Sequence, residues 1–311
     1  MTPARPLSGD QHELRHGSYT AAIASVGASL RSLQYDERDL VVPFEPDEVR
    51  PVFRGAVLAP WPNRVVDGRY KFDGVTRQLA LTEPARGHAL HGLAAWLDFA
   101  LVDRTAAEVV LTATIEAQVG YPWRLEVTAS YRLDDRGLRT TIAVRNDSAA
   151  AAPVGLSGHP YLVAGEGRVD DWSLELPAAR YFAVDAERLA PQHEESVAAR
   201  DGAFDFRSPR LLGTTFIDHA FTALDRSPGG LATVRLVAPD GGGVGMVWDA
   251  ASPWVQIHTA DRPEAPELSR IGLAVEPMTC VPDAFNSGVG LITLKPGHRT
   301  ETSWTIFAIP V

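Results

Sequence analysis

Apolar and polar side chains alternate over much of residues 108–146, and this alternation is the feature that most constrains the fold. Every second position is apolar in 108–117 and again in 124–133, and the pattern recurs in 138–146 after the turn sequence DDRG. A period of two places successive side chains on opposite faces of a β-strand. These segments therefore predict three consecutive half-buried antiparallel strands, a meander.

The rest of the chain shows no sustained helical period of 3.6 residues. Residues 50–60 predict at most a short helical turn, because Pro60 and Pro62 end it. Connections rich in turn residues, with 26 glycines and 23 prolines in all, separate many short apolar runs. We therefore expect an all-β chain that forms one large antiparallel β-sandwich or barrel domain over 1–311. Further strands are expected at 19–25, 29–34, 69–73, 78–82, 99–103, 172–176, 232–238, 244–249, 253–259, 271–276, 291–294 and 302–309.

Composition narrows the classes of partner and compartment. The formal net charge of −10 argues against a nucleic-acid partner, because such binding relies on clustered Lys and Arg. A single cysteine, Cys280, excludes an intramolecular disulfide and a zinc site made of several cysteines. No apolar run approaches the roughly 20 residues that span a bilayer, and the N-terminus has no signal-peptide core. We therefore expect a cytoplasmic protein with no membrane partner.

Glu276 opens the most unusual stretch of the chain, EPMTCVPDAFNSG (276–288). The preceding letters IGLAV predict a buried strand, which Pro277 would turn out of the sheet. A carboxylate at the end of a buried strand either pairs with a cation or has a function. Burial would raise its pKa and suit it to proton transfer. In the turn that follows, Asp283 and Asn286 are expected to hydrogen-bond the backbone.

His159 lies at the end of another apolar run, in the sequence VGLSGHPYL. The glycine before it allows a ligand to approach closely, and the proline after it stiffens the chain. A rigidly held imidazole is what a general acid or base requires. The alternative interpretation is a buried structural histidine at a strand end.

His88 and His91, in GHALHGL, could offer two ligands to a metal ion. Asp218 with His219, or Glu276, could complete such a set. The spacing matches no zinc signature, however, and turn histidines that hydrogen-bond the backbone are the simpler interpretation.

Three further polar residues suit the recognition of hydroxyl groups. Arg64, in PNRVVDG, presents a planar guanidinium. Asp218 is a lone acid between apolar flanks in FIDHAF, and its simplest alternative role is to cap an Asx turn. Gln256 lies on the strand expected at 253–259. Together with aromatic residues in one cleft, these side chains would make a sugar-binding site.

Several of these segments follow one another in an order that identifies a family. They are PNRVVDGRYKFDG, HALHGL, GHPYL, FIDHAF, WVQIHT and EPMTCVPDAFNSG with LITLKPGHRTETSWTI, and they span residues 62–306. In this order the chain resembles the aldose 1-epimerase (galactose mutarotase) family. The resemblance implies a galactose mutarotase-like supersandwich, whose concave sheet holds a sugar. It also implies an isomerase that interconverts the α and β anomers of a free aldose without cofactor or metal.

The resemblance also assigns roles, position by position. Glu276 matches the catalytic base and His159 the catalytic acid, and His91 matches the second histidine near the ring oxygen. The positions that match the sugar-hydroxyl binders are Arg64, Asp218 and Gln256.

Two departures from the family pattern leave the sugar unassigned. Leu162 and Val163 follow HPY where an aromatic residue and an asparagine are expected, and GLAAW (92–96) follows His91 where many members have a second glycine. These positions would border the sugar. One alternative function is an epimerase of a phosphorylated or modified sugar, for which RSPR (207–210) is a weak basic cluster. Another is a non-catalytic carbohydrate-binding module, although such a module needs no acid–base pair. We expect a small-molecule sugar as the partner of a monomer or homodimer.

Overall fold

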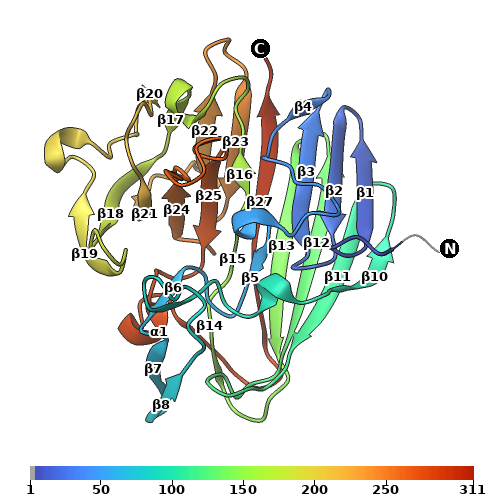
Figure 1. The fold of residues 1–311 in the computed structure, drawn as a ribbon, viewed down its shortest axis with the longest axis vertical. Helices are drawn as coiled ribbons and strands as arrows, with labels where there is room; N and C mark the ends of the chain where they lie inside the picture. The colour runs from blue at the N-terminus through green and yellow to red at the C-terminus, as the bar shows by residue number, and fades with distance from the viewer. Residues whose placement is uncertain (1–3) are drawn as a thin grey trace.

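Antiparallel strands dominate the computed structural model, which describes residues 4–311 (Figure 1). One layer is a nine-stranded sheet in the order β10-β11-β12-β13-β27-β23-β22-β17-β20. The predicted meander is confirmed as β11, β12 and β13, which pair in continuous antiparallel register. The strands are β10 (Ala100–Arg104), β11 (Glu108–Ile115), β12 (Leu125–Asp134), β13 (Gly137–Asn146), β27 (Arg299–Ile309), β23 (Gly243–Trp248), β22 (Ala232–Val237), β17 (Ser173–Glu175) and β20 (Arg210–Leu211).

The second layer consists of two smaller sheets that lie side by side on one face of the nine-stranded sheet (Figure 1). The four-stranded sheet is formed by β1 (Gln11–His16), β2 (Tyr19–Ala24), β3 (Ser29–Tyr35) and β4 (Arg38–Asp39). The six-stranded sheet has the order β16-β25-β24-β21-β18-β19. Its strands are β16 (Tyr161–Leu162), β25 (Leu273–Met278), β24 (Trp254–His258), β21 (Asp218–Leu224), β18 (Ala178–Val184) and β19 (Pro191–Ser196).

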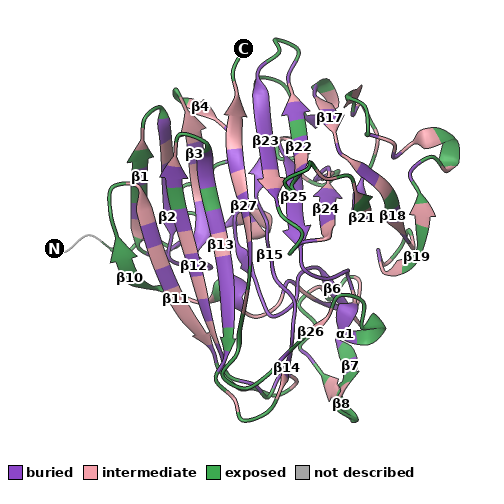
Figure 2. Cartoon of the chain, turned by 180° about the vertical axis from the view of Figure 1, so that it is seen from behind, coloured by how far each residue is buried: buried purple, intermediate pink, exposed green. Residues whose placement is uncertain are grey.

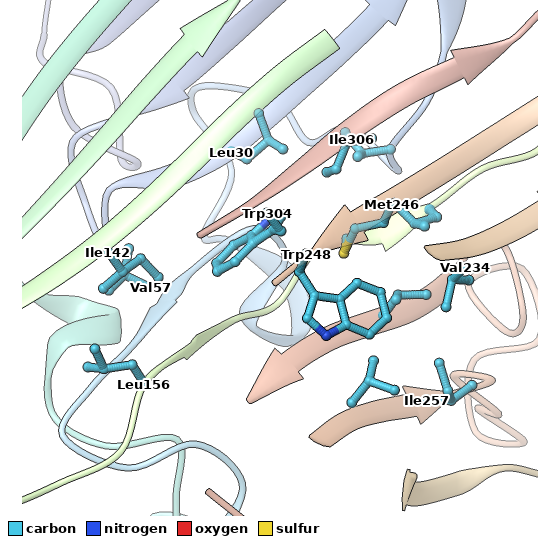
Figure 3. Close-up of a cluster of buried hydrophobic side chains, with 14 of the residues drawn as sticks. Leu30, Val57, Ile142, Leu156, Val234, Met246, Trp248, Ile257, Trp304 and Ile306 are labelled. Atoms are coloured by element: carbon cyan, nitrogen blue, oxygen red, sulfur yellow. The ribbon is translucent and has the colours of Figure 1, made fainter. Parts of the chain in front are cut away.

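The core lies between these layers and follows from the alternation in the sequence. Along β12 the buried and partly exposed residues alternate, and Figure 2 shows strands of the same sheet banded in purple, pink and green along their length. Trp248 of β23 lies near Ile257 of β24, and Trp304 and Ile306 of β27 belong to the same buried cluster (Figure 3). Burying such large apolar side chains is the main favourable contribution to the stability of the fold.

The expectation that Pro277 turns the chain out of the sheet is wrong. Strand β25 continues through Pro277 to Met278, and Pro277 lies opposite Val255 of β24. On its other side β25 pairs with β16 only at Leu273 and Ala274, so Pro277 lies beyond that partner. A proline is tolerated at a strand position where no neighbouring strand needs its missing N–H as a hydrogen-bond donor. Glu276 is therefore inside a strand, not at its end.

Short elements complete the chain. A strand was expected at 78–82, but β7 (Arg69–Phe72) and β8 (Val75–Gln78) form a tight hairpin earlier, because Asp73 and Gly74 both adopt positive φ. The only α-helix among residues 4–311 is α1 (Ala284–Ser287), and none of the described helices could cross a membrane. The remaining elements are η1 (Pro51–Phe53), β5 (Val57–Leu58), β6 (Arg64–Val66), β9 (His88–Leu90), η2 (Ala94–Trp96), β14 (Ala152–Val154), β15 (Ser157–Gly158), η3 (Val169–Asp171), η4 (Arg200–Gly202) and β26 (Ile292–Leu294).

Candidate active site

A cavity of about 400 Å³ lies where the six-stranded sheet meets the segments around η1, β6 and β9. It brings together five of the six residues singled out in the sequence, which are Arg64, His91, His159, Asp218 and Glu276. Gln256, the sixth, does not line the cavity but lies buried behind Asp218. Residues more than 200 positions apart thus form one polar site.

Glu276 is held on β25 with its carboxyl group almost fully buried, at 1% exposure. Its cross-strand neighbour on β24 is Gln256. Its Oε2 atom is buried without a hydrogen-bond partner among the described residues. Burial first, and then the negative charge of Asp218, raise the pKa of Glu276 well above its usual value, against the opposing charge of Arg64. Burial therefore makes the carboxylate form of Glu276 less favourable than that of an exposed glutamate.

His159 lies between β15 and β16, where two backbone hydrogen bonds fix it. Its N–H donates to the carbonyl of Ala56, and its own carbonyl accepts from the N–H of Gly55. Its Nε2 atom is 3.5 Å from Oε1 of Glu276, and its buried Nδ1 has no partner among the described residues. Burial, and then the nearby His258, lower the pKa of His159 to about 3. The imidazole is thus neutral in the free site.

His91 follows β9 in a left-handed conformation, with φ 61°. The next residue, Gly92, is also left-handed and packs so close to Ala59 that a Cβ would meet its carbonyl oxygen at 2.3 Å. The backbone N–H of Asn63 donates to Nδ1 of His91 at 3.2 Å. The neutral ring therefore carries its proton on Nε2 and acts as a hydrogen-bond donor. Burial lowers the pKa of His91 well below its usual value, which keeps the ring neutral.

Arg64 organises the opposite end of the cavity. Its guanidinium makes two hydrogen bonds to Glu83, of 2.8 and 3.1 Å, and its Nη2 lies 3.7 Å from Asp218. Arg86 contacts Glu83 at 2.8 Å as well. Burial by itself would raise the pKa of Glu83, but Arg64 and Arg86 lower it below its usual value. Glu83 is therefore a carboxylate that orients Arg64.

Asp218, at the start of β21, is oriented by its neighbours on β24. The side-chain amide of Gln256 donates to its Oδ1 at 2.6 Å, and His258 Nδ1 lies 3.9 Å from the same oxygen. Burial alone would raise the pKa of Asp218, but the charges of His258 and Arg64 and the Gln256 hydrogen bond lower it. Asp218 is therefore a strand residue with a fixed charge, and the alternative of an Asx-turn cap is wrong.

Several lining residues were not anticipated from the sequence. Side chains at positions 254, 256 and 258 lie on the same face of β24. The period of two along the strand could therefore have predicted that His258 shares a face with Gln256. Glu83 follows no strand and lies in a polar loop, so nothing local distinguishes it. The other unanticipated lining residues on which later points depend are Phe53, Tyr161 and Arg262.

Within residues 4–311, the group of side chains that could hold a metal ion lies among the residues that line the cavity. Ligand atoms of His91, His159 and Glu276 lie within 4.8 Å of one another. The pairing of His88 with His91 is not supported, because His88 accepts the N–H of Asp67 and contacts the carbonyl of Arg188. A metal ion bound by His91, His159 and Glu276 would use the ligand atoms that these residues present to the cavity.

Two other expectations about the site need correction. The arginines of RSPR are used elsewhere, since Arg207 pairs with Asp205 and Arg210 donates to backbone carbonyls. Leu162 and Val163 do not line the cavity, because strand β16 turns Leu162 into the core. Their departure from the family pattern therefore does not bear on direct contact with a ligand.

The turn after Glu276 has a role that reaches outside it. The carboxylate of Asp283 accepts the backbone N–H of Val66 at 2.9 Å and the side-chain amide of Asn286 at 2.7 Å. The carbonyl of Arg64 accepts the N–H of Asp283 at 2.8 Å. The turn therefore fastens strand β6, which carries Arg64, to the segment that follows Glu276.

Comparisons with known proteins place the chain in a family. The family model for aldose 1-epimerase matches residues 10–307. The uncharacterized protein YihR of Escherichia coli (strain K12) is 37% identical over 303 residues, which cover 96% of this chain and 94% of YihR. The aldose 1-epimerase of the same organism is 29% identical over 187 residues, which cover 54% of this chain and 52% of that enzyme.

A solved structure shows the same fold. The GalM/aldose epimerase homologue from C. elegans superimposes with a TM-score of 0.83 at 19% identity, covering 97% of this chain and 99% of that one. The predicted galactose mutarotase-like β-sandwich is therefore confirmed.

Proposed function

Because the chain belongs to the aldose 1-epimerase family, we propose that it interconverts the α and β anomers of an aldose. The observation that carries the proposal is the buried pair of Glu276 and His159, whose Oε1 and Nε2 atoms lie 3.5 Å apart at the edge of the cavity. A carboxyl group and an imidazole at this separation can serve the two oxygens on the anomeric carbon at the same time.

Ring opening needs one base and one acid. Glu276 takes the proton of the C1 hydroxyl, and the C1–O1 bond becomes the carbonyl of the aldehyde. The bond between C1 and the ring oxygen breaks, and His159 gives its proton to that oxygen. Rotation about C1–C2 then presents the other face of the aldehyde, and the same steps in reverse close the ring.

In this proposal the proton of the pair lies on the carboxyl group in the free site, because burial disfavours the charged forms of both Glu276 and His159. Transfer of that proton to His159 leaves the total number of protons unchanged and produces the carboxylate and the imidazolium that start ring opening. A bound sugar favours this arrangement, since its C1 hydroxyl donates to a carboxylate and its ring oxygen accepts from an imidazolium. In the proposed steps, ring opening leaves Glu276 protonated and His159 neutral. The neutral pair of the free site therefore has the same protonation state as the complex with the open-chain aldehyde.

The remaining residues bind and orient the sugar. The Nε2–H of His91 is a neutral donor beside the reacting pair, so it can stabilise charge that develops on an oxygen of the anomeric centre. Arg64 and Asp218 offer a donor and an acceptor to hydroxyl groups at the other end, with Gln256 holding Asp218 in place. The steps move only protons and one C–O bond, so the proposal assigns no cofactor.

The direct test is anomer exchange with the purified protein. Freshly dissolved α-anomers of a panel of neutral aldoses should equilibrate faster with the protein than without it, as followed by polarimetry or by the anomeric proton signals in NMR. Binding of a sugar without faster exchange would favour the non-catalytic carbohydrate-binding module and contradict the proposal.

A second candidate substrate is an aldose with an anionic substituent, such as a phosphate or a carboxylate. The half-buried Arg262 lines the cavity, and no ion pair or side-chain hydrogen bond of its guanidinium is found within residues 4–311. An unpaired guanidinium is a common partner for carboxylate and phosphate groups.

The two candidates separate in a competition between neutral and anionic sugars. If the substituent is anionic, a hexuronate or a hexose 6-phosphate should show a larger kcat/KM than the parent hexose. In that case Arg262→Gln should lower kcat/KM for the anionic sugar and leave the neutral one unchanged. Equal kcat/KM values for all three sugars would rule out the second candidate.

A further inference from the structure

The imidazole of His159 lies nearly parallel to two aromatic rings. The ring centroid of Tyr161 is 5.0 Å away and that of Phe53 is 6.4 Å away, and both rings are inclined by 17° to the imidazole. Phe53 also lies 4.7 Å from His91, at an angle of 57°. Phe53 is thus an aromatic side chain whose ring lies beside both histidines of the cavity.

The backbone that carries Phe53 is strained. Val52 and Phe53 are consecutive left-handed residues, with φ of 44° and 59°. This conformation is unfavourable for bulky and β-branched residues and persists only where the surroundings enforce it. Here the hydroxyl of Tyr161 donates to the carbonyl of Val52 at 3.3 Å, and the N–H of Ala56 donates to the carbonyl of Phe53 at 3.0 Å.

The same segment is bonded directly to His159. The bonds from Gly55 to the carbonyl of His159 and from His159 to the carbonyl of Ala56 are 2.8 and 3.1 Å long. Gly55 has φ 66°, and a Cβ there would meet the carbonyl oxygen of Leu30 at 2.1 Å. Any shift of residues 52–56 would therefore move the histidine.

Arg50 supports the segment from behind. Its buried guanidinium donates to Ser29 Oγ and to the carbonyl of Ala95, each at 2.7 Å, and has no carboxylate partner among the described residues. It also lies over the rings of Trp96 and Phe53, 4.3 and 6.0 Å from their centroids. A cation held between these rings restricts where Phe53 can move.

Global stability does not account for this arrangement. Phe53 is only half-buried and packs against a small satellite cluster, not against the main core. Its ring instead lines the cavity. Backbone strain at a half-buried residue of the cavity wall indicates that the cavity, and not the main core, requires this conformation of Phe53.

We infer that Phe53 is a positioning residue for His159 and His91. Its ring sets the orientation of both imidazoles and keeps water from them, and Arg50 and Tyr161 hold it in its strained conformation. The inference rests on the proposed function, because it describes how the proton-transfer group is kept in line with Glu276.

The first test is a kinetic comparison of two Phe→Leu variants. Phe53→Leu should lower kcat by about 10- to 100-fold with a smaller change in KM, because a misplaced acid slows the reaction of bound sugar. Phe72→Leu is the matched control, since Phe72 is also half-buried and packs against a ring, Trp123, but lies outside the cavity. Phe53→Tyr, which keeps the ring, should retain most of the activity. Equal losses of kcat in the two leucine variants would overturn the inference.

The second test measures the imidazole itself and does not depend on turnover. Opening the Phe53 side of the ring to water should move the NMR titration of His159 to higher pH in Phe53→Leu but not in Phe72→Leu. The charged and titratable groups that face His159 stay the same in both variants, and they are Glu276, His91, Tyr161, His258, Asp218 and Arg50. An unchanged titration in Phe53→Leu would overturn the inference. A wild-type protein that fails to speed anomer exchange would instead contradict the proposed function, and the titration would still decide the role of Phe53.

Discussion

The two ends of the cavity are built on opposite principles. At one end, Glu276 Oε2 and His159 Nδ1 are buried without hydrogen-bond partners among the described residues. At the other end, Arg64, Glu83 and Asp218 form a connected network of hydrogen bonds and ion pairs, and the unpartnered atoms there are Gln256 Oε1 and His258 Nδ1 beside Asp218. Both ends are buried to a similar degree, so exposure alone does not cause the difference.

This difference in pairing distinguishes the proposed proton-transfer groups from the groups proposed to bind and orient the sugar. Buried polar atoms without partners are costly, and native proteins retain few of them. Under the proposed function, the unpaired end would gain its partners from the bound sugar, while the paired end is organised before binding. The first end should therefore control kcat, and the second should control binding and stability.

The largest expected effect is the loss of the carboxyl group at the unpaired end. Glu276→Gln removes the base but keeps the shape of the neutral side chain, so kcat should fall by about 10²- to 10⁴-fold while sugar still binds. Polarimetry measures the rate, and calorimetric titration with sugar measures the binding. Full mutarotase activity in this variant would contradict the assignment of Glu276.

At the paired end, Arg64→Met should destabilise the fold. It leaves Glu83 and Asp218 buried with less compensating charge, which typically costs about 3–5 kcal/mol in the free energy of unfolding. Urea denaturation followed by tryptophan fluorescence gives this value. The double variant with Glu83→Gln removes one of the two stranded charges and should recover part of the loss. A single variant as stable as the wild type would show that the two ends do not differ in this respect.

The pH dependence of stability provides a smaller and more specific comparison. The folded-state pKa of Glu276 is raised, so its contribution to stability is fully present below the unfolded value of about 4.5 and is lost as pH rises toward the folded value. Glu276→Gln removes this loss. The unfolding free energy of the variant minus that of the wild type should therefore increase with pH above 4.5, by at most about 1.4 kcal/mol per pH unit. Urea titrations at pH 5, 6, 7 and 8 measure it, and a constant difference would contradict the raised pKa.

The smallest effect is expected four residues beyond Glu276. Cys280 is buried in a satellite cluster with Val281 and Ala284 and does not line the cavity. Cys280→Ala should lower the unfolding free energy by about 1 kcal/mol and leave kcat unchanged. A loss of kcat comparable to that of Glu276→Gln would show that the thiol belongs to the reactive end.

Much of the fold could be predicted because its signal is local. The alternation in 108–146 determines which face of each strand is buried, and the nine-stranded sheet keeps that register. Strands β18, β19 and β21 were not predicted, because their sequences mix polar and apolar residues without a clear period. Pro277 was misjudged because its tolerance depends on how far the neighbouring strand β16 extends, which no local pattern records.

The site could be predicted only in part, for a related reason. Glu276, His159 and His91 were found because each lies in an unusual local sequence that resembles a family motif. Glu83 and Phe53 were not found, because their importance arises from what they contact. Glu83 matters through Arg64, and Phe53 through the two imidazoles. A role that depends on contact with a residue distant in sequence produces no local sequence pattern from which it could be predicted.

The spacing of the cavity residues has a consequence for how the protein gains activity. The segments that carry Arg64, His159, Asp218 and Glu276 belong to different parts of the chain, and their contacts close loops of tens to hundreds of residues. Chains dominated by such distant contacts fold slowly. Recovery of mutarotation during refolding would therefore report on the last steps of assembly, and the enzyme would serve as its own folding sensor.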